Sequence, residues 1–78
     1  MVETIKKYCR VDRREISFLK FILEAYDGLA VLTTVDSEKG IVVINIAPGC
    51  EVDVEMILQD LKKNVMIEKI DLKNQLSE

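Results

Sequence analysis

The chain has 78 residues, with 11 basic against 14 acidic side chains and a formal net charge of −3 at pH 7. This length allows one domain with a small core. The mildly acidic balance argues against a general nucleic-acid binder, which would carry a basic patch to neutralise phosphates. There is no His, and the two thiols, Cys9 and Cys50, match no zinc-site spacing. We therefore expect no metal, no cofactor and no nucleic-acid partner.

No stretch approaches the roughly 20 consecutive apolar residues of a membrane span. The first residues also carry no apolar run of signal-peptide length. We therefore expect a cytoplasmic protein with no membrane partner, and both thiols reduced.

The first half of the chain is predicted to form a strand followed by a helix. Alternating apolar and polar residues over positions 4–11 indicate the strand, although Lys7 falls on its apolar side. Asp12 and Glu15 have the spacing of an N-cap box. We expect a helix over residues 13–26, ending where Gly28 can adopt the left-handed cap conformation.

The second half is predicted to form a hairpin, a helix and a last strand. Residues 29–35 and 41–47 are rich in β-formers and flank a polar turn over residues 36–40. A second helix is expected over residues 52–63, with a narrow apolar stripe centred on Leu61. Residues 66–72 are predicted to form the last strand. Residues 73–78 are predicted to form a frayed polar tail.

This order of elements predicts one α+β domain over residues 1–78. The β-α-β-β-α-β order is typical of a ferredoxin-like fold, with a four-stranded antiparallel sheet and two helices on one face. We place the first and third strands in the middle, running parallel, and the second and fourth at the edges. A swapped or split variant of the same units is the alternative.

The first helix is more apolar than a one-sided helix requires. Its apolar residues cover an arc of roughly 200° at about 100° per residue, whereas a one-sided helix needs little more than 100°. The extra arc either packs on the second helix and the chain ends, or forms an interface centred on Phe18 and Phe21.

The third strand is apolar on both faces. Ile41 and Val43 lie on one side, and Val42, Ile44 and Ile46 lie on the other. The outer face of a central strand in an open sheet usually alternates with polar residues. Either a small apolar face stays exposed, or a second copy covers it. We expect a homodimer, because symmetric dimers are the commonest assembly, and a further protein partner is possible.

Two loops lead into the predicted helix N-termini, where free backbone N–H groups favour anions. If the central strands are parallel, these loops meet at one end of the sheet. Arg13, Arg14, Gly49 and Cys50 would then form an anion site. The alternative is that Asp12 and Glu51 already fill both helix starts. Cys50 before a helix is also a candidate reactive thiol, although no His is present to act as its base.

The sequence Val11-Asp12-Arg13, followed by a helix ending in Tyr26-Asp27-Gly28-Leu29, resembles the opening half of an ACT-type regulatory domain. The resemblance implies amino-acid binding at a dimer interface and regulation of an enzyme. The Pro-Gly pair that usually follows the Asp-Arg is replaced here by Arg14 and Glu15. Metallochaperones are similar in fold, but their Cys-x-x-Cys in the first loop is absent.

The chain also resembles a family of short uncharacterised bacterial proteins whose helix ends in Glu-Ala-Tyr-Asp-Gly, matched here by residues 24–28. We expect a self-associating binding or regulatory module that is not an enzyme and has no catalytic residue. One alternative is an ACT-like small-ligand sensor acting in trans on an enzyme. The other is a thiol-dependent enzyme subunit that uses Cys50.

Overall fold

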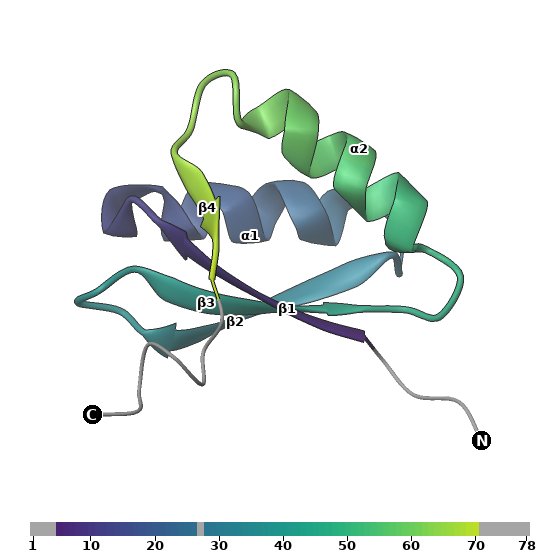
Figure 1. Ribbon diagram of the computed structural model, residues 1–78, viewed down its shortest axis with the longest axis horizontal. Coiled ribbons are helices and arrows are strands. Elements are labelled where there is room, and N and C mark those ends of the chain that lie inside the picture. Colours follow the sequence, from purple (N-terminus) through teal and green to yellow (C-terminus); the bar gives the residue numbers. More distant parts are fainter. Residues whose placement is uncertain (1–4, 27, 71–78) are drawn as a thin grey trace.

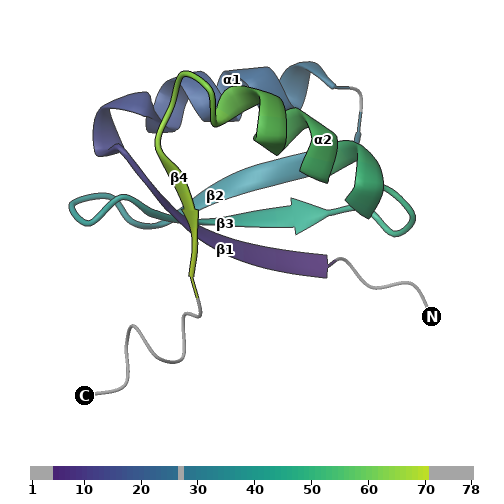
Figure 2. The ribbon, with the colours of Figure 1, turned by 45° about the horizontal axis from the view of Figure 1, so that its top comes forward.

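A computed structural model describes residues 5–26 and 28–70. The fold is a four-stranded sheet with both helices packed on one face (Figures 1 and 2). The elements in chain order are β1 (Ile5–Val11), a 3₁₀ turn η1 (Arg13–Glu15), α1 (Ile16–Ala25), β2 (Ala30–Asp36), β3 (Ile41–Ile46), α2 (Glu51–Leu61) and β4 (Ile67–Lys69). The predicted α+β, ferredoxin-like βαββαβ architecture is therefore confirmed.

The sheet has the order β2-β3-β1-β4, with β1 and β3 in the middle as predicted. All three strand pairs are antiparallel. The prediction that β1 and β3 run parallel was therefore wrong. The β1–α1–β2 crossover returns the chain to the direction of β1, and the β2–β3 hairpin then reverses it. A strand inserted between β1 and β2 in this way must oppose both.

The start of α1 differs from the predicted cap box. Asp12 accepts a hydrogen bond from the backbone N–H of Arg14, and so caps η1 rather than α1. Glu15 precedes α1 without a side-chain capping bond. At the other end of the helix, Gly28 has the expected left-handed conformation, with φ of 75°. The helix is shorter than predicted, because its first turn is wound as 3₁₀.

The last strand is also shorter than predicted. β4 covers three residues, and it pairs with β1 over Cys9 to Val11. The end of the predicted strand, at residues 71–72, and the predicted tail at residues 73–78 lie outside the described residues. Within the described ranges, neither helix is long and apolar enough to cross a membrane.

The main core lies between the helices and the sheet. Leu19 and Leu23 of α1 and Val54 and Leu58 of α2 pack over the strands. The strand residues and the post-helical residue in this cluster are Cys9, Val11, Ala30, Leu32, Val42, Ile44, Ile46, Val65 and Ile67. Burial of this apolar surface is the main force holding the helices on the sheet.

The β2–β3 turn is tied to the end of β1 through Gly40. The backbone N–H of Val11 donates to the carbonyl of Gly40 at 2.8 Å. Gly40 has φ of 73°, and a Cβ built on it would lie 2.0 Å from the Val11 carbonyl oxygen. Glycine is therefore required here both by the backbone conformation and by the close approach of β1.

Candidate functional site: the outer face of the helix layer

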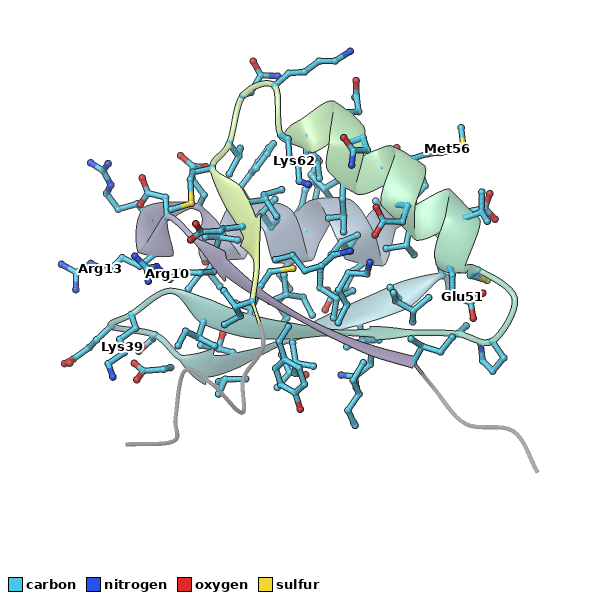
Figure 3. The ribbon with its side chains drawn as sticks, viewed as in Figure 1. Arg10, Arg13, Lys39, Glu51, Met56 and Lys62 are labelled. Atoms are coloured by element: carbon cyan, nitrogen blue, oxygen red, sulfur yellow. The ribbon has the colours of Figure 1, made fainter. Side chains whose placement is uncertain are left out.

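The residues predicted to form an anion site lie at two opposite ends of the sheet. In the β1–β3 pairing, Arg10 lies opposite Ile41 and Ile5 lies opposite Ile46. The loop after β1 and the loop after β3 are therefore separated by the length of β3. Six residues of strand span about 20 Å at roughly 3.4 Å per residue. Figure 3 shows Arg13 and Glu51 at these opposite ends. The four-residue anion site is therefore not assembled, because β1 and β3 are antiparallel.

The loop after β1 is occupied by its own ion pair. The carboxylate of Asp12 accepts from Nε of Arg14 at 3.2 Å and from Nη2 at 3.0 Å. These side-chain hydrogen bonds, together with the one from the Arg14 backbone, lower the pKa of Asp12 below its ordinary value. The arrangement satisfies the turn and neutralises Arg14. It matches the alternative in which Asp12 fills the helix start.

The two thiols also lie apart and in different environments. Cys9 lies in the core opposite Val42 and is almost fully buried, and this burial raises the pKa of its thiol. Cys50 lies half-buried immediately before α2, at the far end of the sheet. The structure therefore places no second thiol beside Cys50.

A charged cluster that the sequence pattern did not reveal links α2 to the sheet. Nζ of Lys7 donates to Oε2 of Glu55, and Nζ of Lys69 lies 3.8 Å from the same oxygen. The hydrogen bond to Glu55 raises the pKa of Lys7, and the same bond lowers the pKa of Glu55. The one available signal was the position of Lys7 on the apolar parity of β1. Its partner 48 residues away could not be inferred.

The predicted interface residues of β3 are already covered within one chain. Ile41 and Val43 lie on the helix-free face of the sheet, opposite Arg10 and Tyr8. Their exposed fractions are 2% and 8%. They therefore present almost no surface to a second copy. The expected cover for this face was a second copy, whereas both side chains are already buried within one chain, so the reason for placing these two residues in an interface no longer applies.

The predicted interface residues of α1 are exposed. Phe18 is 45% exposed and Phe21 is 70% exposed on a helix whose Leu19 and Leu23 face the core. The alternative, in which the extra apolar arc packs on α2 and the chain ends, does not hold for these two side chains. Phe21 in particular points away from the sheet, because it is about 160° around the helix from both buried leucines.

The outer side of α2 adds a second apolar surface, which was not predicted from the sequence. Val52 is 71% exposed and Met56 is 65% exposed. Both lie on an open stretch of the α2 surface together with Glu51, Gln59 and Lys63. Figure 3 shows Met56 on the side of α2 away from the sheet. The sequence pattern of α2 could have indicated this surface, because Val52 and Met56 lie on the face opposite its apolar stripe.

The chain was also compared with known proteins. A family model described as a domain of unknown function (DUF4911) matches residues 9–65. No curated protein and no solved structure matches the chain significantly. The match agrees with the resemblance to a family of short uncharacterised proteins. It includes both outer helix faces and most of the sheet.

Proposed function

The chain belongs to the DUF4911 family, described as a domain of unknown function, and from its structure we propose that it is a non-enzymatic, self-associating binding module. One observation carries this proposal. The outer faces of both helices expose large apolar side chains on the same side of the molecule, namely Phe18, Phe21, Val52 and Met56. Scattered apolar residues are normal on protein surfaces, whereas large neighbouring apolar side chains mark interaction sites.

The aromatic residues make α1 the stronger of the two surfaces. Aromatic side chains are enriched at the energetic centres of protein interfaces, because they bury a large area at a low cost in conformational entropy. Phe18 and Phe21 are the two phenylalanines of the chain, and neither is placed in the core. A small domain that leaves both phenylalanines outside its core favours a role for them between molecules.

The ionisable groups support a non-catalytic role. Among the described residues, those with shifted pKa values are two ion-paired sets, Asp12–Arg14 and Lys7–Glu55, and the buried thiol of Cys9. Each shift has a structural cause within the fold. Perturbed groups at an enzyme's active site are typically held in a cleft facing a substrate.

The experiment is a measurement of molar mass by light scattering over a concentration series. We expect the mass to rise from that of one chain towards twice that value. Thermal-shift screening with amino acids tests the ligand-sensor alternative, and a stabilisation that depends on Asp12 and Arg13 would favour it. A monomeric mass at every concentration up to high micromolar would contradict self-association.

A further inference from the structure

The exposed face of α1 has the pattern of a surface that packs against a copy of itself. Phe21 lies at its centre, with Ser17 four residues before it and Ala25 four residues after it, all three exposed. Residues four apart lie on the same side of a helix. A large side chain between two small ones leaves space on either side of it. An identical helix crossing in the opposite direction can insert its own large side chain into that space.

The charges on α1 give the isolated helix little electrostatic stabilisation. Its first turn contains no acidic residue and its last turn contains no basic residue. Lys20 precedes Glu24 by four residues, which is the less favourable order for a pair within a helix. Both are exposed, and within the described part of the chain neither makes an ion pair. Both charges are therefore available to pair with groups of a second copy.

An antiparallel second copy provides such groups. Suppose that two α1 helices pack about a two-fold axis that passes between them at the level of residue 22. Residues equidistant along the chain from position 22 then lie at the same level in the two copies. Lys20 then faces Glu24 of the second copy, and this pair occurs twice.

The helical positions agree with this pairing. At about 100° per residue, Lys20 and Glu24 lie on one flank of the exposed face, about 40° apart. Phe18 lies on the other flank, about 60° from Phe21. A two-fold axis perpendicular to both helices keeps each flank opposite itself, so the charged flank of one copy meets that of the other with opposite charges in contact. This is the self-complementarity that an isologous interface requires.

We propose that a second copy of this chain docks on α1 in the antiparallel direction, with Phe21 beside the two-fold axis and Lys20 paired with Glu24 of the other copy. The inference rests on the proposed self-association and specifies its surface. One helix pair buries less area than a standard stable interface of about 1,600 Å². The dimer is accordingly weak and concentration-dependent.

The test uses the single variants Lys20→Glu and Glu24→Lys, alone and mixed, in sedimentation equilibrium at fixed ionic strength. Each variant alone places like charges at both symmetric contacts of its homodimer. We expect the dissociation constant of that homodimer to rise about tenfold over the wild type. In the equimolar mixture, a mixed dimer pairs the two acidic side chains of one variant with the two basic side chains of the other. We therefore expect heterodimers close to wild-type strength. Repulsion within one helix cannot be relieved by mixing, so this recovery reports contacts between copies.

A second pair of variants keeps the test independent of charge pairing. Phe21→Glu is expected to weaken the dimer about a hundredfold, since it places charge at the centre of an apolar contact. Met66→Glu, at an exposed position outside both helices, is the matched control and should leave dimerisation unchanged. A wild-type dimer that tolerates Phe21→Glu, or whose charge variants show no recovery on mixing, would overturn the α1 interface while leaving self-association intact. A monomeric wild type would overturn both.

Discussion

Lys7 of β1 and Glu55 of α2 form an ion pair on the helix side of the sheet, where the neighbouring strand residues are apolar. The side chain of Lys7 is 17% exposed and that of Glu55 is 38% exposed. The pair therefore ties the second helix to the central strand at the margin of the core. Its contribution differs from that of a fully exposed pair, because Lys7 cannot regain full hydration when its partner is removed.

The first prediction concerns this pair. We expect Glu55→Gln to lower the free energy of unfolding by about 0.5–1.5 kcal/mol, because it leaves the half-buried ammonium of Lys7 without a carboxylate. Lys7→Met should be neutral or stabilising, since it continues the apolar face of β1. Urea unfolding measures both. A larger loss for Lys7→Met than for Glu55→Gln would show that the ion pair itself stabilises the fold.

The pH dependence of the pair has a definite sign. The folded-state pKa of Glu55 is lowered from its ordinary value of 4.5, so its stabilisation is present above that value and is lost as the pH falls through the lowered pKa. The raised pKa of Lys7 gives stabilisation that is lost only as the pH rises above the ordinary lysine range. We expect the stability difference between wild type and Glu55→Gln to be constant from about pH 6 to 8 and to shrink below about pH 4.5. A difference that does not shrink as the pH falls below about 4.5 would contradict this.

The third prediction concerns Gly40. Gly40→Ala should lower the free energy of unfolding by about 2 kcal/mol or more. The alanine would have to adopt the left-handed backbone conformation, and its Cβ would also clash with the Val11 carbonyl. Gly49→Ala is the matched control. Gly49 has φ of 86°, and a Cβ added there would meet nothing within 4 Å, so only the conformational penalty of about 1 kcal/mol applies. Equal losses for the two variants, measured by urea unfolding, would remove the argument for close approach.

The fourth prediction concerns the phase of α2. Leu58 and Val54 are its buried residues, and Leu61 is partly exposed, so the predicted stripe was centred one turn too late. We expect Leu58→Ala to cost about 2–5 kcal/mol, Leu61→Ala to cost less, and Met56→Ala to cost little. Urea midpoints that rank Leu61→Ala or Met56→Ala above Leu58→Ala would mean that the helix faces the sheet differently.

Many features of the fold could be predicted from local patterns, and the failures have physical causes. Period-two alternation and the Gly-terminated helix placed the elements to within a few residues. The apolar residues on both faces of β3 were expected to leave one face exposed or covered by a second copy, and both faces are instead buried within one chain. The predicted direction of β3 relative to β1 was wrong, although the predicted order of elements already requires them to be antiparallel, because the crossover through α1 keeps the chain direction and the hairpin reverses it. That one error brought Arg13 and Cys50 together when they lie at opposite ends.

The candidate surface was also predictable in part from a local pattern, the helical periodicity of α1. The width of the apolar arc on α1 identified Phe18 and Phe21, because helical periodicity places both away from the buried leucines. Contacts between distant segments were not accessible in this way. The Lys7–Glu55 pair depends on how α2 crosses the sheet, which no local pattern in the sequence reveals.

The most direct test of self-association through α1 is the molar mass of the wild-type chain by sedimentation equilibrium, from about one to several hundred micromolar, a range that brackets a weak dimer. We predict a reversible rise from one chain mass to two, fitted by a single monomer–dimer equilibrium. In the same series Phe21→Glu should stay monomeric while Met66→Glu follows the wild type. A wild-type mass that remains that of one chain across the whole range would contradict the central claim.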